Sequence, residues 1–551
     1  MKTTLRVLLL VMLLAALLAS CSYARNGQPP DNAVVVRVVA NSSLSNWLTI
    51  SIKEFNNANV QTSNGKPVYV TLKLVEAGQA VIDITADHSA APDLWIPDSP
   101  VWTSILAQKG NASFQKDCVS VAQSPLVIAV WRPIAESLGW PGRSLGWLDI
   151  GSLAADPSAW SYYSGGQFGP TFRLGHTHPG ISGPGAETLL AVVQAALSKR
   201  EPLNADEIQQ PIVQASVGAF EGAVSSFGTS TDSLGESMQE RGANYLSAAV
   251  VYESTVIQYG AGDPNIVPIY PFEGTFVATH PACINSAKSI EAQEAAIIFR
   301  TYLTGEKGQQ EAVANGLRPV NHQVPAAVLA SQAQGVDLNQ PKVVFEEPGV
   351  DSVYAIQSLW QAARKNVNLV MILDTSGSMG GSKMDNARQA AVQFVGEMGE
   401  NDYISLIAFH EGRAVTLVEH NKVGAKRQDI IARINALLAR GETPLYDAIG
   451  FGADIIARNS SSDTTNAMVV LTDGLDTSSS SYNFDKTLLS AAIAHDTTIF
   501  TIAYGSDADQ EKLSNLAQEG HGNFYLGTDA NIAAIYEEMS AVFGGSQGIG
   551  R

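Results

Sequence analysis

Runs of consecutive apolar residues alternate with segments of helical periodicity in the last third of the chain. The apolar runs have strand length and cover residues 368–373, 402–409, 467–472 and 497–504. Residues 385–398 and 508–518 instead repeat their apolar positions at helical spacing. Strands that are buried on both faces read as continuous apolar runs, and their alternation with helices is typical of a parallel sheet covered on both sides. The pattern predicts a doubly wound α/β domain.

The middle of the chain, from residue 34 to about residue 340, alternates in the same way with more varied spacing. Strands are expected at residues 34–39, 92–99, 124–130 and 268–276, and helices at residues 44–55, 186–198 and 290–303. Residues 353–363 carry an apolar helical face and lead directly into the C-terminal domain. We therefore expect two α/β units joined by a short helical linker that lets them pack together.

The N-terminus has the pattern of an export signal. Lys2 and Arg6 precede an apolar run over residues 7–18, which is too short to be a stable membrane span. The junction Leu18-Ala19-Ser20-Cys21 resembles a bacterial lipobox, which implies a signal peptide over residues 1–20 and a lipid on Cys21. The alternative is a signal peptide without lipid that is cut near Cys21. Either reading places the protein outside the cytoplasm. The first anchors it to the membrane through residues 21–33 as a tether.

Length and net charge limit the number of domains and the kinds of binding partner. The 551-residue chain is too long for one core and carries a net charge of −19. Residues 366–551 hold 12 basic and 23 acidic side chains, a net charge of −11. An acidic surface argues against nucleic acid and favours cations.

Five oxygen-bearing side chains in the C-terminal third predict a metal site. They follow the predicted strands or lie in short polar loops: Asp374, Ser376, Ser378, Thr443 and Asp473. Ligands bind beyond the carboxyl ends of strands in such sheets, and hydroxyl and carboxylate oxygens suit Mg²⁺ or Mn²⁺. Two carboxylates leave the ion positively charged and open to a carboxylate from a protein partner.

These residues resemble the metal-ion-dependent adhesion site of von Willebrand factor A domains. The D-x-S-x-S motif, the later Thr and the strand-terminal Asp are all present, and the resemblance covers residues 366–543. It implies that Ser376, Ser378 and Thr443 contact the metal directly or nearly so. It also implies that Asp374 and Asp473 act mainly through water. The implied function is adhesion or docking without catalysis.

The middle unit resembles extracellular solute-binding proteins of the two-lobed, type II periplasmic-binding fold. The resemblance rests on the Ser-ended first strand, on SPLVIAV and YPFEGTF, and on the late GLRP. It implies a domain over residues 34–345, with lobe two at about 132–265 and crossing strands near 126–130 and 266–275. A linker helix would occupy residues 346–365, and residues 544–551 would form a flexible tail.

The solute would bind between the lobes, gripped by helix N-termini. Candidate contacts, matched by position, are Ser42, Ser43, Ser99 and Ser124 from lobe one, and Ser182, Gly185 and Tyr252 from lobe two. Each residue is alternatively an ordinary cap or turn residue. The set predicts a small polar or anionic solute, and no basic cluster argues for a multiply charged oxyanion.

Cys118 and Cys283 remain once Cys21 is assigned to the lipid. In an exported protein they form either a disulfide, which the export signal favours, or two buried free thiols. Cys118 lies just before one crossing strand and Cys283 just after the other, so the two sulfurs can meet if these strands pair.

Enzyme motifs are absent from the sequence. It holds no phosphate-binding G-x-x-x-x-G-K-[ST] loop and no zinc helix. His176 and His178 permit a metal role, but surface or capping histidines in a loop are the simpler interpretation. Three functions remain: a surface protein that binds a solute and docks a partner, the solute receptor of an ATP-driven importer, and a chelatase partner. The export signal and the missing ATPase motor count against the third.

Overall fold

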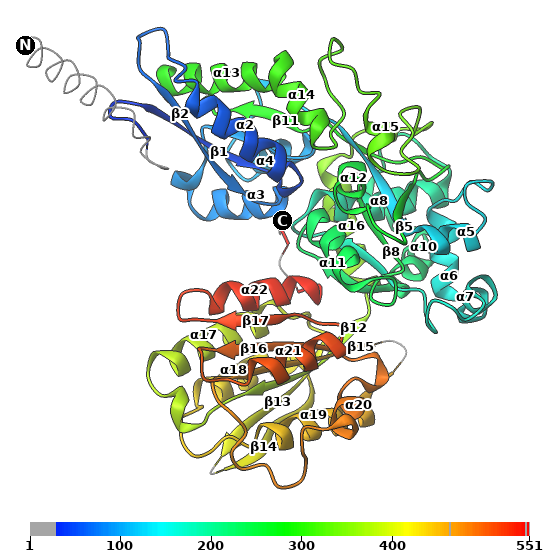
Figure 1. Ribbon diagram of the computed structural model, residues 1–551, viewed down its shortest axis with the longest axis vertical. Helices are drawn as coiled ribbons and strands as arrows, with labels where there is room; N and C mark the ends of the chain where they lie inside the picture. The colour runs from blue at the N-terminus through cyan, green and yellow to red at the C-terminus, as the bar shows by residue number, and fades with distance from the viewer. Residues whose placement is uncertain (1–28, 411, 462–463, 546–547, 550–551) are drawn as a thin grey trace, which may run out of the picture.

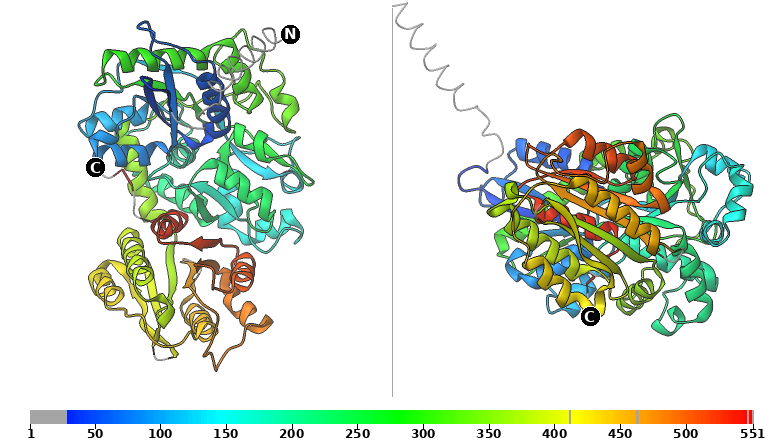
Figure 2. Two further views of the ribbon diagram at one scale, coloured as in Figure 1. Left: turned by 60° about the vertical axis from the view of Figure 1, so that its left-hand side comes forward. Right: turned by 90° about the horizontal axis from the view of Figure 1, so that it is seen from below.

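Three β-sheets organise the part of the chain that the computed structural model describes, namely residues 29–410, 412–461, 464–545 and 548–549. Two sheets belong to the middle unit and one to the C-terminal domain, and the three bodies are distinct in Figures 1 and 2. The signal peptide over residues 1–20, the lipidation site Cys21 and most of the tether over residues 21–33 lie outside the described residues.

Lobe one is built on a five-stranded sheet in the order β2-β1-β3-β11-β4. Strands β1 (Val34–Ala40), β2 (Val68–Leu74) and β3 (Leu94–Ile96) run parallel, and β11 (Pro281–Ile284) is antiparallel to both β3 and β4 (Cys118–Ser120). The flanking helices are α2 (Ser45–Asn57), α3 (Ala77–Ala86), α4 (Val101–Gln108), α13 (Ile290–Thr304) and α14 (Glu306–Ala314). The chain thus returns to lobe one after building lobe two.

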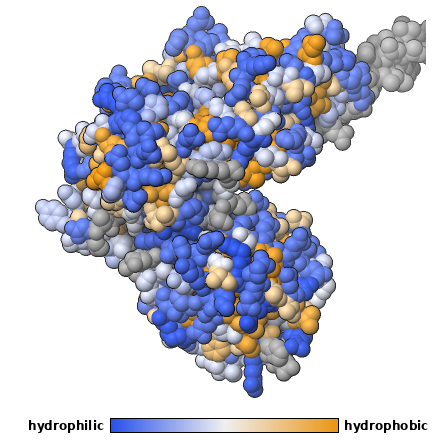
Figure 3. Space-filling model, turned by 180° about the vertical axis from the view of Figure 1, so that it is seen from behind, coloured by the Kyte–Doolittle hydropathy of each residue, from blue (hydrophilic) through white to orange (hydrophobic). Residues whose placement is uncertain are grey.

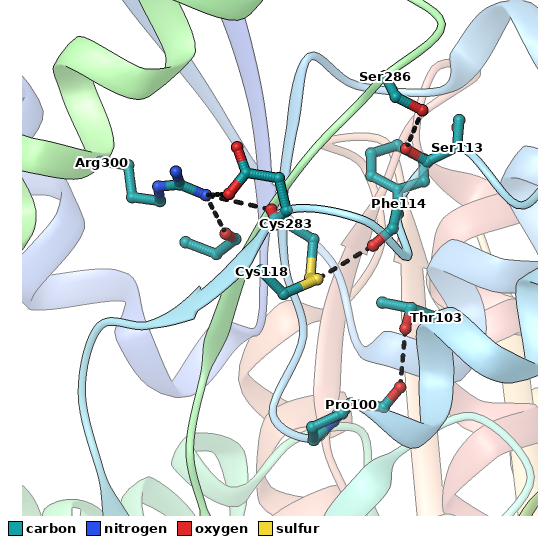
Figure 4. The surroundings of a disulfide bond; sticks show 10 residues. Pro100, Thr103, Ser113, Phe114, Cys118, Cys283, Ser286 and Arg300 are labelled. Carbon is teal, nitrogen blue, oxygen red and sulfur yellow. Dashed lines mark hydrogen bonds and ion pairs between the residues drawn. A yellow bond between two sulfur atoms is a disulfide. The ribbon is translucent and has the colours of Figure 1, made fainter.

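A disulfide joins Cys118 and Cys283 across the paired strands β4 and β11. The Cα atoms are 4.0 Å apart, and the bridge closes a separation of 165 residues. Both strands belong to the lobe-one sheet, and each adjoins one of the predicted crossing strands in sequence, Cys118 before the first and Cys283 after the second. Figure 4 shows it beside Arg300, whose Nη1 donates to Asp117 Oδ1 at 2.8 Å.

Lobe two has a six-stranded sheet in the order β10-β5-β8-β6-β7, with β9 also paired to β5. Its strands are β5 (Ser124–Trp131), β6 (Leu174–Thr177), β7 (Val224–Gly228), β8 (Ala248–Tyr252), β9 (Ile266–Ile269) and β10 (Val277–Ala278). The sheet therefore takes in both predicted crossing strands and extends beyond residues 132–265. Only the start of the predicted strand at 266–275 forms β9, because residues 270–276 turn away to place Glu273 and Gly274 against Trp147.

The C-terminal domain is a six-stranded sheet in the order β14-β13-β12-β15-β16-β17. The strands are β12 (Asn366–Leu373), β13 (Tyr403–His410), β14 (Arg413–Lys422), β15 (Thr464–Thr472), β16 (Thr498–Tyr504) and β17 (Phe524–Gly527). All neighbours are parallel except β14, which is an antiparallel edge strand. The helices are α17 (Ser382–Glu397), α18 (Val423–Asn435), α19 (Leu445–Asn459), α20 (Lys486–Ala492), α21 (Gln510–Glu519) and α22 (Ile532–Val542). This is the predicted doubly wound fold.

The connection between the units is packed and does not form a free linker. Helix α16 (Val350–Ala363) contributes Ile356 and Trp360 to the apolar core of lobe two. Residues after α22 turn back as well: the Gly545 carbonyl accepts a 2.7 Å hydrogen bond from His178, and Ile549 is buried beside Trp102 of lobe one. The described part of the predicted flexible tail is therefore anchored to both lobes.

Candidate functional site

The five predicted metal residues gather at the carboxyl edge of the C-terminal sheet. Asp374 follows β12 and Asp473 follows β15, and these two strands are paired neighbours in register, Leu373 opposite Leu471. Both carboxyls are almost completely buried. The carboxyl ends of neighbouring parallel strands meet at one edge, so the topology brings together two residues that lie 99 positions apart in the chain.

Hydrogen bonds connect four of the five residues in a chain. Asp374 accepts from the Ser376 backbone N–H at 2.7 Å, and the Ser376 and Ser378 hydroxyl oxygens are 3.0 Å apart. Ser378 in turn donates to Asp473 Oδ1 at 2.6 Å. Burial, opposed by its hydrogen bonds, raises the pKa of the Asp374 carboxyl. The oxygens are thus converged and largely desolvated, which suits a small hard cation.

Thr443 reaches the same place from the loop before α19. That loop is tied to the serine loop by the Gly377 N–H, which donates to the Gly441 carbonyl at 3.0 Å. A methyl group built on Gly474 would lie 3.7 Å from Thr443 Oγ1 and 4.0 Å from Ser378 Oγ, so both hydroxyls border one point. The structure therefore brings all five predicted residues together.

Lys383 is a neighbour that sequence reasoning missed. Its Nζ lies 2.6 Å from Asp473 Oδ2, and the lysine side chain is about one-third exposed while Asp473 is buried. The ammonium is a cation of this chain held at a proposed metal ligand, and it shows that the oxygens accept positive charge. Hydroxyls, two carboxylates and this stand-in cation fit Mg²⁺ or Mn²⁺. Among the described residues no set of three or more His, Cys, Asp or Glu offers a softer or more acidic metal site.

The metal edge lies at the carboxyl ends of the strands, the far ends from lobe two. The opposite edge, where the strands begin, meets lobe two around a cavity of about 780 Å³. Asn366, Thr464 and Thr498, at or near the starts of β12, β15 and β16, line this cavity together with Arg173 of lobe two. The domain thus attaches through one edge and presents the other, and Figure 3 shows a notch between the two parts on one face.

Four of the predicted solute contacts meet acidic side chains where the lobes touch. Ser42 donates to Glu76 Oε1, and Ser182 of lobe two donates to Glu76 Oε2 at 2.8 Å. Tyr252 of lobe two donates to Asp98 Oδ2 at 3.4 Å. The fourth, Ser99, donates to Glu347 Oε2 at 2.6 Å.

The other three predicted contacts have structural partners. Ser43 donates to the Asn41 side chain at 2.6 Å within a local turn. Ser124 donates to the Ser254 hydroxyl at 3.2 Å inside lobe two. Gly185 lies against the end of β6, where an added Cβ would come within 2.1 Å of the Thr177 carbonyl oxygen. These three contacts are those of turn, core and close-packing residues.

The acidic residues at this interface were missed in the sequence. Glu76 follows β2 and Asp98 follows β3, so the strand-end rule that located Asp374 would have found them. Burial, reinforced by the neighbouring Glu76, raises the pKa of Asp98 to about 8. Burial next to Asp98 also raises the pKa of Glu187 well above its usual range. Burial therefore favours the protonated form of both carboxyls when nothing neutralises them.

Neither histidine is a surface residue, which corrects the sequence-based interpretation, and only His178 lies in a loop, directly after β6. His176 lies on β6, fully buried, with Nε2 at 2.9 Å from Glu221 Oε1. His178 accepts the Gly180 N–H at Nδ1, as a cap would, and burial lowers its pKa to about 4. Each Nε2 has its own protein partner, which makes a shared metal unnecessary.

Comparison with known families agrees with this architecture. The chain belongs to the family described as bacterial extracellular solute-binding protein, whose model matches residues 36–318. Residues 368–538 match the von Willebrand factor type A domain, abbreviated VWA below. The protein is thus a solute-binding domain followed by a VWA domain, and the family places it outside the cytoplasm.

Individual relatives share only parts of the chain. Inter-alpha-trypsin inhibitor heavy chain H4 of Sus scrofa is 28% identical over 248 residues, which is 42% of this chain and 25% of that protein. The von Willebrand factor type A structure from Catenulispora acidiphila has 22% identity and a TM-score of 0.29, covering 32% of this chain and 42% of that one. The sulfate-binding protein SubI of Mycobacterium tuberculosis has 18% identity and a TM-score of 0.39, covering 54% and 90%.

Within the described residues, every helix is too short or too polar to cross a bilayer.

Proposed function

We propose that this protein binds a small solute between its lobes and a protein partner through a divalent metal on its VWA domain, without catalysis. The observation that carries the docking half is the orientation of the metal edge. Asp374, Ser376, Ser378, Thr443 and Asp473 lie at the edge opposite the one that meets lobe two. A Mg²⁺ or Mn²⁺ there would coordinate a carboxylate of a partner while the solute-binding domain holds the far side.

Residue roles follow from the contacts. Ser376, Ser378 and Thr443 would supply the hydroxyl ligands. Asp374 would hold the loop through its bond to the Ser376 N–H and accept a metal-bound water. Asp473 would exchange the Lys383 ammonium for the metal or its water. The ion itself would supply positive charge that attracts the partner's carboxylate.

The packed joint supports joint action of the two halves. The Arg173 guanidinium of lobe two pairs with Asp496 of the VWA domain, and Arg241 donates to the His521 carbonyl at 3.2 Å. Because α16 packs in the core of lobe two, a movement of the lobes would shift the contacts at this joint. Any coupling between the solute site and the metal site would be reciprocal. These contacts favour a docking protein over the importer receptor, whose VWA domain would be a scaffold only.

Calorimetric titration of the full chain with Mg²⁺ tests the metal-binding half of the proposal. One site is expected, and Ser378→Ala should weaken it at least about tenfold, or about 1.4 kcal/mol. The matched control is Asp507→Ala, an exposed carboxyl in the loop after β16 at the same edge. Equal binding by wild type and Ser378→Ala would refute the assignment.

The docking half is tested with glutamate-containing peptides on an immobilised full chain. Retention in Mg²⁺ and release by a chelator are expected. Retention that survives both the chelator and Ser378→Ala would show that the metal is not the bridge.

A further inference from the structure

Three carboxyls are buried where the lobes meet. Glu76 and Asp98 come from lobe one and Glu187 from helix α8 (Gly183–Leu197) of lobe two, and they are 8%, 0% and 4% exposed. A fourth carboxyl, Glu347, lies exposed at the edge and accepts from Ser99. We call these four residues the interlobe acidic cluster. The lobes are closed over it, because the Gly78 N–H donates to the Ile181 carbonyl across the interface at 2.9 Å.

The cluster has no basic partner among the described residues, unlike Glu253 and Glu221 in the same unit. Glu253 pairs with Arg318 at 2.6 Å, and Glu221 meets His176 at 2.9 Å. Among the described residues, no ion pair joins a Lys, Arg or His to any member of the cluster. Buried carboxyls are costly unless they are neutralised or paired.

Two buried carboxyl oxygens of the cluster also lack a hydrogen-bond donor. Asp98 Oδ1 and Glu187 Oε2 are buried without a hydrogen-bond partner. The indole N–H of Trp102 is close enough to lower the pKa of Asp98 slightly, but neither atom makes a hydrogen bond of good geometry. Buried polar atoms without partners are rare in folded proteins, and two on adjacent carboxyls indicate a missing donor.

His280 is a separate observation of the same kind. Its ring is fully buried, and neither ring nitrogen has a partner. The ring packs edge-on against Tyr252 at 5.9 Å between centroids, and Tyr252 donates to Asp98. The backbone N–H of His280 donates to the Asp98 carbonyl at 3.2 Å. Burial lowers the pKa of His280 to about 3, so it offers one neutral donor and one acceptor beside the cluster.

We propose that the solute bound between the lobes is an organic cation, a small amine whose ammonium group is held by Asp98 and Glu187 with Glu76 beside them. This deepens the solute-binding half of the proposed function and rests on it. An ammonium group supplies three N–H donors and the positive charge that the cluster lacks. An anionic solute would instead add a like charge to a buried acidic site.

An amine fits better than a metal ion. Among the described residues, no three His, Cys, Asp or Glu side chains are placed to hold a metal. Glu76 is instead saturated by hydroxyl and amide donors from Ser42, Ser182 and Asn41. The oxygens left without partners are on Asp98 and Glu187, which an ammonium group can bridge.

The test uses the full chain and calorimetry with 1,4-diaminobutane, butylamine, sulfate and Ca²⁺ as separate probes. We expect the diamine or the monoamine to bind and sulfate to be silent. Asp98→Asn and Glu187→Gln should each weaken the amine at least about tenfold. Glu346→Gln, an exposed carboxyl next to Glu347 and outside the cluster, is the matched control. Two buffers of different ionisation enthalpy should reveal proton release on amine binding, because the carboxyls must ionise.

The outcomes are separable. Silence of both amines, or amine binding that both variants retain, overturns the proposal. Sulfate binding with silent amines overturns the cation class while leaving solute binding intact. Ca²⁺ binding that survives Ser378→Ala but is lost in Asp98→Asn would assign a metal to the cluster and also overturn it. Asp98→Asn removes a buried acid, so a melting temperature at or above wild type distinguishes lost binding from lost folding.

Discussion

The VWA metal edge and the interlobe acidic cluster are built by the same rule and end in different electrostatic states. Each places carboxyls directly after parallel strands: Asp374 and Asp473 after β12 and β15, Glu76 and Asp98 after β2 and β3. At the VWA edge a lysine reaches Asp473, and serine hydroxyls link the two acids. In the cluster a second lobe closes over the acids and brings another acid in place of a base.

The difference shows how burial of a strand edge changes the charge of the carboxyls that lie there. At the VWA edge the buried Asp473 pairs with Lys383, whose side chain is about one-third exposed. The cluster is buried by α8, and its carboxyls lower their cost by taking up protons, which is why the pKa of Asp98 rises to about 8. One site holds a carboxyl paired with a lysine, and the other holds carboxyls with no basic partner among the described residues.

Removing the cation from a paired carboxyl should have the largest effect. Arg318→Met would leave Glu253, which is fully buried, without its partner. We expect a loss of about 3–5 kcal/mol, because an uncompensated buried charge is strongly destabilising. Urea unfolding followed by circular dichroism measures it.

The double variant Arg318→Met with Glu253→Gln is the control for this prediction. It should recover most of the stability, because the charge is removed along with its partner. A loss below about 1 kcal/mol in Arg318→Met alone would show that pairing does not distinguish Glu253 from the cluster.

Asp98 should make the folded protein less stable as the pH rises, which is the opposite of the usual effect of a carboxyl group. With its pKa at about 8 when folded and an ordinary value when unfolded, the folded state holds an extra proton between these two values. Stability should therefore fall as pH rises from about 4 to 8, by at least about 1.4 kcal/mol. Glu76 and Glu347 face this carboxyl as like charges and act in the same direction.

Asp98→Asn removes the titrating group, so thermal melts between these pH values should show a flatter profile than wild type. The midpoint at the alkaline end should rise, because a neutral amide replaces a buried acid. Parallel profiles for the two proteins would contradict the protonated state of Asp98.

The smallest effect is expected at Lys383. Lys383→Met removes the ammonium that competes for Asp473, so Mg²⁺ should bind more tightly by about 1 kcal/mol or less, up to about fivefold in Kd. Calorimetry in low salt measures it, with Lys486→Met, an exposed lysine at the start of α20, as control. Weaker Mg²⁺ binding in Lys383→Met would mean that the lysine assists the site.

Local signals predicted the VWA edge almost completely. Four of its six strands were expected from apolar runs, and their boundaries lie within a few residues of those expected, as with β16 at Thr498–Tyr504. The edge strands β14 and β17 were not expected, because β14 is largely polar and β17 is short. Asp374 and Asp473 were found because each follows an apolar run directly, and the serines and Thr443 were found by the motif they complete. Lys383 was not, because nothing local distinguishes a lysine at the start of α17 that reaches Asp473, 90 positions away.

The sequence by itself predicted the two α/β units, the central strands of the VWA sheet and the five oxygens that gather at its carboxyl edge. These depend on hydrophobic periodicity and strand-end position, which are local properties. Only the tertiary structure decided which polar residues share a buried space. Ser124 and Ser43 donate hydrogen bonds to nearby polar side chains, whereas Glu76, Asp98 and Glu187 lie together at the interface of the two lobes. Burial and mutual repulsion set the charge of such a cluster, and both arise only after distant segments have packed.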